Sequence, residues 1–449
     1  MDYFNIKQYN TTYRSEIFAG LSTFMSIAYI LVLNPTILSQ VGMDRYGVFV
    51  ATALSIAITT TIAAFHTRMS LIYAPNIGLS YFFIIFCTEQ FDGNWGIALL
   101  AVYLSGIGVL ICIRYRICKR ILETIPECVV HGIKVGMGFC LIKLGLLSCG
   151  ALKKVGSLYS FGQFDTLECV YSFVGLIIIG LFLRFKKYYG LTFGFGSVYI
   201  LGIILTFIIN YINVGGPFLN YIIETLTHRS SFPNLTEVAF HFPPIEGIFK
   251  DSKLIFQLII TVLLMTVITL VNAQDLIRTT AQRLKDDNDS YYKDYLTRCL
   301  RMNGIGNIIS ASLGSSPITV CPENDINSEC GAKTGISSLT VSIAMLVTLI
   351  FGPLFNIDNM FLSAPLLLFV GGMIIKSVKL DKISSPIERL LFIIITVYLG
   401  LTFELVNAIL YGISIYIIMK LLAGKKEQLD HSMIFWILCF IVYLVIQLI

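Results

Sequence analysis

The residues best placed to do chemistry lie in one polar stretch, residues 314–335, between two strongly apolar segments. Glu323 directly follows Pro322, and Pro317 lies five residues before that proline. A proline lacks the backbone N–H and crowds the preceding turn, so these two prolines rule out a continuous helix. Broken backbone is tolerated within a bilayer only where it is buried in protein or lines a cavity, and an ionisable residue there is a candidate functional group. The stretch predicts a site on a broken membrane span, with a loop outside the bilayer as the alternative.

Glu323 is the main candidate, both for substrate binding and for proton coupling. A carboxylate that faces a water-filled cavity can accept two hydrogen bonds from a flat, amide-like ligand, and protonation would remove that capacity. The alternative role for Glu323 is to cap the helix that follows the break. Two further carboxylates, Asp325 and Glu329, fit better on a solvated cytoplasmic shoulder.

Other polar and aromatic side chains fall where they could face the same cavity. Asn272 and Asp275 share one face of a helix at the end of an apolar segment. Asn272 offers donors and acceptors, which suits the edge of a heterocyclic base. Asp275 is a second candidate for proton coupling, or it begins the charged loop. Thr23 belongs to a stripe of hydroxyl groups, which bond a neighbouring helix more often than a ligand. Phe82 or Phe83 could stack on a flat ligand.

The composition places these residues in a membrane protein. The chain is 56% hydrophobic and only 13% charged, its mean hydropathy is +0.80, and soluble domains average roughly 25% charged residues. Its 11 cysteines include no CxxC pair, so they indicate small buried hydrophobes and not a metal site or disulfide framework. We expect an all-α polytopic membrane protein with no cofactor, no metal and no nucleic-acid partner.

Apolar runs of about 20 residues, the length that spans a bilayer, recur along the chain. We expect spans at residues 16–36, 47–66, 71–88, 96–113, 126–149, 167–185 and 191–212, and then at 254–277, 297–313, 314–332, 336–353, 360–377, 386–402 and 404–422. With the N-terminus in the cytoplasm, 24 of the 32 lysines and arginines fall on the inside, as the positive-inside rule requires. About fourteen spans of a plasma-membrane protein are therefore predicted. Residues 433–449 form either a further span or an in-plane helix.

The two groups of seven spans suit a seven-plus-seven inverted repeat. The first repeat would cover residues 1–212 and the second 254–422, with an extracytoplasmic connecting loop at 213–253 and an extra C-terminal segment at 423–449. Pro75 lies 59 residues after residue 16, and Pro317 lies 63 residues after residue 254. Such matched breaks mark the binding site of many transporters. Spans 3 and 10 are each expected to form a short extended piece and a half-helix, whose N-terminal end faces the ligand.

Several motifs resemble the AzgA-type purine permeases of the nucleobase–cation symporter superfamily. These are EIFAGLSTFMSIAYILVLNP (16–35), GVFVATAL (47–54), APNIGLSYFF (74–83), IPECVVHGIKVGMGF (125–139) and GAKTG (331–335). The resemblance covers nearly the whole chain and implies a core domain and a gate domain with the substrate between them. It implies uptake of guanine, hypoxanthine or adenine, coupled to H⁺ or possibly to Na⁺. Members of this fold often pair, and the sequence leaves a homodimer open.

The family pattern carries over to particular residues. The span 10 glutamate of the family falls on Glu323, and its span 3 Gly-Leu-Asn falls on Gly78, Leu79 and Ser80, where serine replaces asparagine. The acidic residue of span 8 becomes Asn272, unless the register shifts.

The run Pro322-Glu323-Asn324 is more similar to the uracil and xanthine branch of the superfamily. The predicted substrate site thus comprises Glu323, Asn272, Gly78, Ser80, Ser316, Thr319, Thr23 and Asn324.

Four other functions are alternatives to purine transport. A uracil or xanthine permease, or a small-anion transporter related to the sulfate permeases, would share the fold. Against an anion, the broken spans contain no arginine or lysine. An intramembrane enzyme is not expected, because the chain lacks His-Glu-x-x-His and Gly-x-Ser-x-Gly motifs and paired aspartates within its spans. A sensor that binds a base without moving it would differ only in flux.

Overall fold

The structure is a computed structural model. It describes residues 11–115, 126–155, 158–185, 190–214, 252–283, 289–321, 323–351, 364–378, 385–402 and 405–422, together with Tyr3, Phe4, Ile6, Lys7, Tyr9 and Ala239. Most of the predicted connecting loop and all of residues 423–449 lie outside this set.

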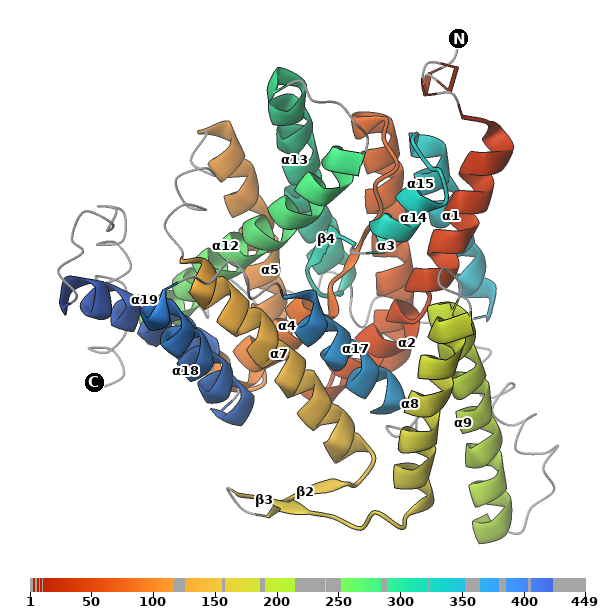
Figure 1. The fold of residues 1–449 in the computed structure, drawn as a ribbon, viewed down its shortest axis with the longest axis vertical. Coiled ribbons are helices and arrows are strands. Elements are labelled where there is room, and N and C mark those ends of the chain that lie inside the picture. The colour runs from red at the N-terminus through yellow and green to blue at the C-terminus, as the bar shows by residue number, and fades with distance from the viewer. Residues whose placement is uncertain are drawn as a thin grey trace.

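Every predicted span up to residue 422 contains a helix, and most bounds agree within a few residues (Figure 1). The first half comprises α1 (Tyr13–Ile27), α2 (Ile30–Leu38), η1 (Ser39–Val41), α3 (Arg45–Thr67), α4 (Ile77–Gln90), α5 (Trp95–Arg114), α7 (Glu127–Ser148), α8 (Leu167–Phe185) and α9 (Gly190–Val214). The second half comprises α12 (Ser252–Arg283), α13 (Asp289–Leu313), α14 (Asn324–Glu329), α15 (Gly335–Thr348), η3 (Leu349–Phe351), α17 (Ala364–Ser377), α18 (Pro386–Thr402) and α19 (Leu405–Leu422).

The helices have the apolar character of membrane spans. In the described part of the chain, five segments are long and apolar enough to cross a bilayer: Tyr13–Val41, Arg45–Thr67, Trp95–Arg114, Glu127–Ser148 and Leu167–Arg184. Shorter apolar helices, among them Leu254–Leu270 and Ala364–Lys376, accompany them. The protein is a multi-pass membrane protein, as predicted, and the count of about fourteen spans stays a prediction.

The two proline-containing segments break as the sequence predicts. β1 (Tyr73–Pro75) pairs antiparallel with β4 (Ile318–Val320), so that Ala74 lies opposite Thr319. Neighbouring helices supply partners for backbone groups of these short strands. Thr60 of α3 accepts a hydrogen bond from the Tyr73 N–H and donates one to the Tyr73 carbonyl, both at 3.1 Å. Asn307 of α13 accepts a hydrogen bond from the Ile318 N–H at 2.8 Å. Strand pairs this short persist inside the protein because their backbone groups are satisfied.

The first span differs from the continuous helix expected at residues 16–36. It divides at Ala28 and Tyr29 into α1 and α2. The N–H groups of Leu31 and Val32 each bond the carbonyl three residues earlier, at 3.1 Å, which is the tighter 3₁₀ pattern. Pro35 lies inside α2 and has no N–H to give, and its ring crowds the carbonyl four residues before it. The break places the Tyr29 side chain beside the two strands.

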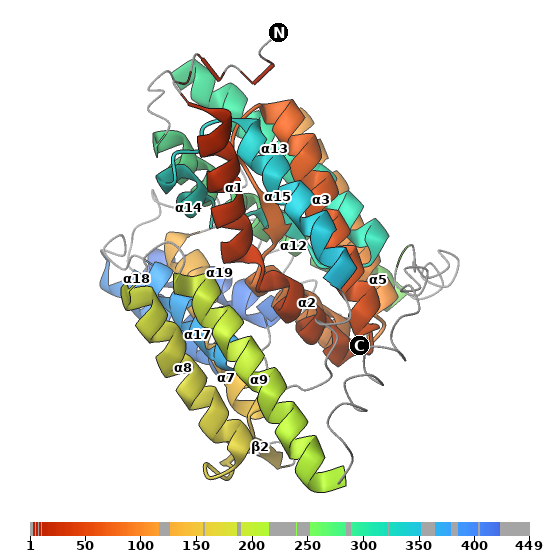
Figure 2. The same cartoon turned by 90° about the vertical axis from the view of Figure 1, so that its right-hand side faces the viewer.

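The helices form two groups, which correspond to the predicted core and gate domains (Figure 2). In the core, α1 and α3 pack on α15, and α13 packs on α3 and α5. In the gate, α7 packs on α17 and α18, and α8 packs on α9. Figure 2 shows α8 and α9 of the gate below α1 and α14 of the core.

Packing in one half has counterparts in the other. In the predicted repeat each span has an equivalent seven spans further along, so α13 is the equivalent of α3 and α15 is the equivalent of α5. The contact between α3 and α15 therefore has its counterpart in the contact between α13 and α5, and the contact between α8 and α9 has its counterpart in that between α18 and α19. An inverted repeat requires such pairs, but the repeat bounds stay a prediction.

A second, short strand pair was not predicted and adds to a fold that is mostly helical, as expected. β2 (Leu152–Val155) and β3 (Leu158–Phe161) form an antiparallel ladder between α7 and α8. Lys143 of α7 lies 3.9 Å from the centre of the Tyr159 ring and donates to the Leu401 carbonyl of α18 at 3.1 Å. Lys143 thus contacts both the β2–β3 strand pair and the end of the gate helix α18.

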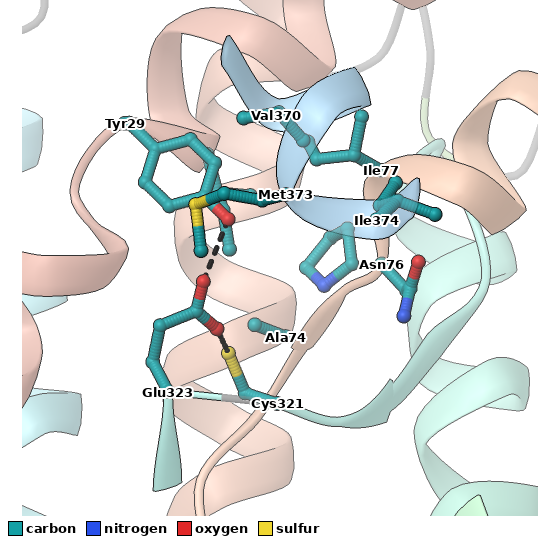
Figure 3. Close-up of a pocket in the computed structure, with 11 residues that line it drawn as sticks. Tyr29, Ala74, Asn76, Ile77, Cys321, Glu323, Val370, Met373 and Ile374 are labelled. Atoms are coloured by element: carbon teal, nitrogen blue, oxygen red, sulfur yellow. Dashed lines mark hydrogen bonds between the residues drawn. The ribbon is translucent and has the colours of Figure 1, made fainter. Parts of the chain in front are cut away.

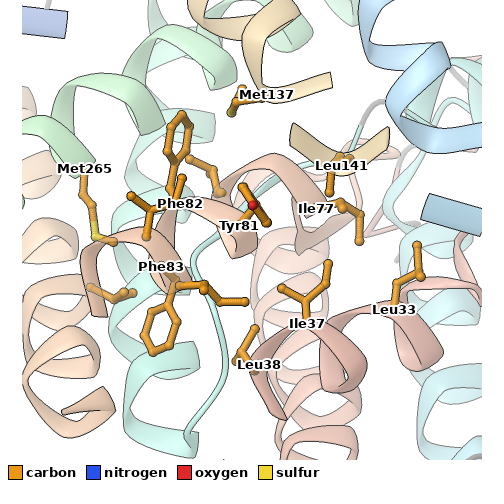
Figure 4. Packing of buried hydrophobic residues seen from close by; sticks show 14 of the residues in the cluster. Leu33, Ile37, Leu38, Ile77, Tyr81, Phe82, Phe83, Met137, Leu141 and Met265 are labelled. Carbon is orange, nitrogen blue, oxygen red and sulfur yellow. The ribbon is translucent and has the colours of Figure 1, made fainter. Parts of the chain in front are cut away.

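The half-helix α4 is enclosed by apolar side chains from core and gate. Figure 4 shows Phe82 and Phe83 of α4 within a cluster that includes residues of α2, α7 and α12. Phe82 is 1% exposed and Phe83 is fully buried. The prediction that one of these rings stacks on a ligand is wrong for this structure, because both are enclosed in the apolar core.

Candidate substrate site

A small cavity lies where the broken spans meet the gate domain (Figure 3). Its volume is about 140 Å³, which is below the roughly 300–1,000 Å³ of pockets that hold drug-sized ligands. The core contributes Tyr29, Ile30, Ala74, Pro75, Asn76, Ile77, Cys321 and Glu323, and helix α17 contributes Val370, Met373 and Ile374. The cavity can therefore admit only a small ligand, held between core and gate.

The Glu323 carboxylate is the acidic group of this cavity, as the sequence predicts. Its Oε1 atom accepts a hydrogen bond from the Tyr29 hydroxyl at 2.7 Å. Its Oε2 atom accepts one from the Cys321 thiol, and both bonds appear as dashed lines in Figure 3. A carboxylate has about four acceptor positions, two on each oxygen. Two side chains of the protein thus take one position on each oxygen.

The end of β4 fixes the position of Glu323. The Cys321 N–H bonds the Ile72 carbonyl at 3.0 Å and extends the strand pairing. Asn324 then clamps the same residue: its Oδ1 accepts from the Ile72 N–H at 2.9 Å and its Nδ2 donates to the Ile72 carbonyl at 3.0 Å. Asn324 is 1% exposed and does not line the cavity. Asn324, a predicted substrate residue, thus bonds the backbone of Ile72 in this structure.

Asn76 occupies the corresponding position after β1. It is the N-cap of α4, where its Oδ1 accepts from the Gly78 N–H at 2.9 Å. Its side chain lines the cavity, whereas the predicted residue Gly78 lies just behind the lining. A Cβ at Gly78 would come within 3.3 Å of Met137 and 3.2 Å of the Asn76 side chain. Glycine therefore allows α4 to begin this close to the gate helix α7.

The predicted residues Ser80 and Ser316 belong to a buried network and do not line the cavity. Both hydroxyls lie 2.7 Å from Oδ1 of Asn34 and 2.8 Å from each other. The Asn34 Nδ2 group donates to Thr52 at 2.8 Å and to Ser315 at 3.1 Å. All five side chains are fully buried. The network ties α2 and α3 to both broken spans.

The remaining predicted residues, Thr23, Thr319, Asn272 and Asp275, do not share one location. Thr23 is buried and donates to the Ala19 carbonyl of its own helix at 2.9 Å. Thr319 is fully buried, and its hydroxyl has no hydrogen-bond partner among the described residues. It pairs with Ala74, so both side chains lie on one face of the strand pair. Asn272 is partly buried on α12, outside the cavity lining, and the side chain of Asp275 lies outside the described set.

Sequence reasoning missed several cavity residues. Tyr29 lies in the same helical stripe as Thr23, and the signal that sets it apart is Pro35 six residues later. Cys321 precedes Glu323 by two residues, which puts both on one side of an extended chain. No local signal marks Val370 or Met373, because their place in the site depends on how the gate packs against the core.

The chemistry of the cavity is that of one carboxylate among neutral groups. Its lining contains no lysine, arginine or histidine, and the wall from α17 is apolar. Among the described residues, no group of three His, Cys, Asp or Glu side chains could hold a metal ion. Such a cavity suits a small neutral ligand that carries N–H donors and a flat apolar face.

Comparison with known proteins identifies the kind of protein. A model of the Permease family matches residues 14–409. The chain belongs to this family. It is a transporter and not an enzyme, as the sequence predicts, and the resemblance to purine permeases is confirmed by its relatives.

Two of these relatives come from Escherichia coli. Adenine permease AdeP of strain K12 is 23% identical over 445 residues, covering 98% of this chain and 95% of the relative. Guanine/hypoxanthine permease GhxP of strain O157:H7 is 26% identical over 437 residues, covering 95% and 92%. Among solved structures, the transmembrane domain of the cyanobacterial bicarbonate transporter BicA superposes with a TM-score of 0.62 at 15% identity, over 88% of this chain and 96% of that one. That likeness supports the permease fold and says nothing of the substrate.

Proposed function

We propose that this permease takes up purine nucleobases, namely hypoxanthine, guanine or adenine, across the plasma membrane. The observation that carries the proposal is the Glu323 carboxylate in a small cavity with no cationic side chain, between the paired broken spans and α17. Two relatives that span nearly the whole chain are named as an adenine permease and a guanine/hypoxanthine permease.

A purine base has the groups that this cavity can bind. Its ring N–H groups would donate to Glu323, and its other edge would face Asn76 across the cavity. Its flat faces would lie against the apolar side chains Val370, Met373 and Ile374 of the gate. A carboxylate orients such a base through paired hydrogen bonds, while the apolar wall accepts any flat ring.

Coupling and movement belong to the same proposal. A protonated Glu323 would keep an acceptor oxygen and gain an O–H donor, both of which the edge of a base can bind, so a base and a proton could be carried together. H⁺ is therefore the proposed coupling ion, with Na⁺ as the alternative. Because the cavity lies between core and gate, rocking of one domain against the other would open it to each side in turn. The N-terminus would lie in the cytoplasm, as the charge distribution predicts.

Two other classes of substrate, small anions and the bases uracil and xanthine, fit this cavity to different degrees. An anion would need a positive group, and the lining offers none. Uracil or xanthine would fit the carboxylate as purines do, and the sequence Pro322-Glu323-Asn324 favours that branch. These bases therefore belong in the same assay.

Uptake of labelled bases in permease-deficient cells tests the proposal. The panel is hypoxanthine, guanine, adenine, xanthine and uracil, measured for the wild type, for Glu323→Gln and for Glu168→Gln, with and without a protonophore. Glu168, at the start of α8, lies outside the cavity and serves as the matched control. We expect purine uptake that Glu323→Gln loses and Glu168→Gln keeps, and that the protonophore collapses. A well-expressed wild type that takes up no base would refute the proposal.

A further inference from the structure

In this structure the site carboxylate is already satisfied by the protein. The Tyr29 hydroxyl donates to Oε1 of Glu323 at 2.7 Å, and the Cys321 thiol donates to Oε2. Each carboxylate oxygen has two acceptor positions. A substrate that donates to Oε1 along the direction now taken by the Tyr29 hydroxyl would replace that hydroxyl, and the hydroxyl would return when the substrate leaves.

Tyr29 also touches the gate domain. Its ring lies edge-to-face with Phe195 of α9, with centres 5.1 Å apart and planes at 74°. Phe195 in turn lies edge-to-face with Phe369 of α17, at 5.7 Å and 81°. Phe195 is 4% exposed, so this row of rings is enclosed. One side chain thus contacts the carboxylate of the core at its hydroxyl and a gate helix at its ring.

Tyr29 lies at the break between α1 and α2. The backbone of Ala28 and Tyr29 keeps right-handed helical angles there, but the hydrogen bonds tighten to the three-residue pattern. Among the residues that line the cavity, Tyr29 is the aromatic one, and its hydroxyl bonds Glu323.

We propose that Tyr29 is a positioning residue that satisfies the Glu323 carboxylate in the empty transporter and is displaced by the substrate, so that site occupancy is passed to the gate through Phe195. This inference rests on the proposed transport of a nucleobase at Glu323. The role of Tyr29 differs between the two halves of the transport cycle, the crossing of the loaded transporter and the return of the empty one. The loaded transporter crosses with Glu323 held by the base, and the empty transporter returns with Glu323 held by Tyr29.

The two half-cycles can be measured separately in the same membrane vesicles. Net uptake of labelled hypoxanthine into empty vesicles requires the empty transporter to return. Exchange against unlabelled hypoxanthine inside the vesicles requires only the loaded transporter. The ratio of the two rates does not depend on how much protein the vesicles contain.

Tyr29→Phe removes the hydroxyl and keeps the ring against Phe195. We expect net uptake to fall about tenfold, which corresponds to about 1.4 kcal/mol, with exchange within about twofold of wild type because the base replaces the hydroxyl. Tyr46→Phe is the matched control, since Tyr46 stacks on Phe49 at the start of α3, outside the cavity, and should change neither rate.

A second variant keeps the inference testable if Tyr29→Phe fails to fold. Phe195→Leu retains the hydroxyl but removes the ring that holds Tyr29, and it should lower the ratio of net uptake to exchange in the same direction. Equal loss of both rates in these variants, or no change in the ratio, would overturn the role given to Tyr29. A wild type that moves no nucleobase would instead refute the proposed function on which the role depends.

Discussion

Replacing Asn34 with alanine should destabilise the junction of the two broken spans. The side chain is fully buried and bonds Thr52, Ser315, Ser80 and Ser316 at 2.7 to 3.1 Å. After its removal, Thr52 and Ser315 can still bond each other at 3.0 Å, and Ser80 and Ser316 at 2.8 Å. Because Ser80 can also donate to the Asn76 carbonyl at 3.2 Å, only the Thr52–Ser315 pair is then left with a hydroxyl that lacks an acceptor among the described residues.

The expected cost follows from that hydroxyl. A buried polar group left without a partner costs about 1–3 kcal/mol, so Asn34→Ala should lose about 1–3 kcal/mol. With an unfolding entropy of about 2 cal/mol/K per residue, that loss lowers the Tm of this chain by about 1–3 °C. Thermal unfolding of the detergent-solubilised protein measures the shift.

Asn94→Ala is the matched control for this measurement. Asn94 is an exposed N-cap of α5, which accepts from the Gly96 and Ile97 N–H groups, and its loss should cost only about 1 kcal/mol. If Asn34→Ala lowers Tm no more than Asn94→Ala does, the network does not stabilise the junction and the reasoning is refuted.

Two further variants probe other parts of the account. Glu16→Gln should destabilise the protein by about 1–3 kcal/mol in thermal unfolding, because the fully buried Glu16 accepts from the Lys333 and Thr334 N–H groups at 2.9 and 3.2 Å; an unchanged Tm would contradict this, and the affinity for the base should not change. Val370→Trp should abolish uptake without reducing the amount of protein in the membrane, because the indole would fill the cavity of about 140 Å³. Ile343→Trp, at a side chain 63% exposed on α15, is its control, and full activity of Val370→Trp would place the substrate elsewhere.

The spans were predictable because their signals are local. Apolar runs and flanking lysines and arginines located nearly every helix, and Pro75 and Pro317 located the two strand breaks. Proline acts on its own turn of backbone, so its effect is visible in sequence. The β2–β3 hairpin also had a local signal, the Gly156-Ser157 pair between two short runs, which is typical of a tight hairpin.

The site was predictable only in part. Glu323 could be found because a carboxylate beside a broken span has few other uses. The hydroxyls of Ser80 and Ser316 could not be assigned to a ligand or to a neighbour, since each bonds a partner far away in sequence, Asn34. The apolar wall from Val370 and Met373 depends on contact between domains, and no sequence pattern encodes that contact.

The most direct test of the central claim is a structure of the wild-type protein determined with hypoxanthine. The account predicts a flat ligand between core and gate, within hydrogen-bond distance of Glu323 and against Val370 and Met373, with the Tyr29 hydroxyl no longer on Glu323. A base bound outside this cavity, or bound within it without contact to Glu323, would contradict the account.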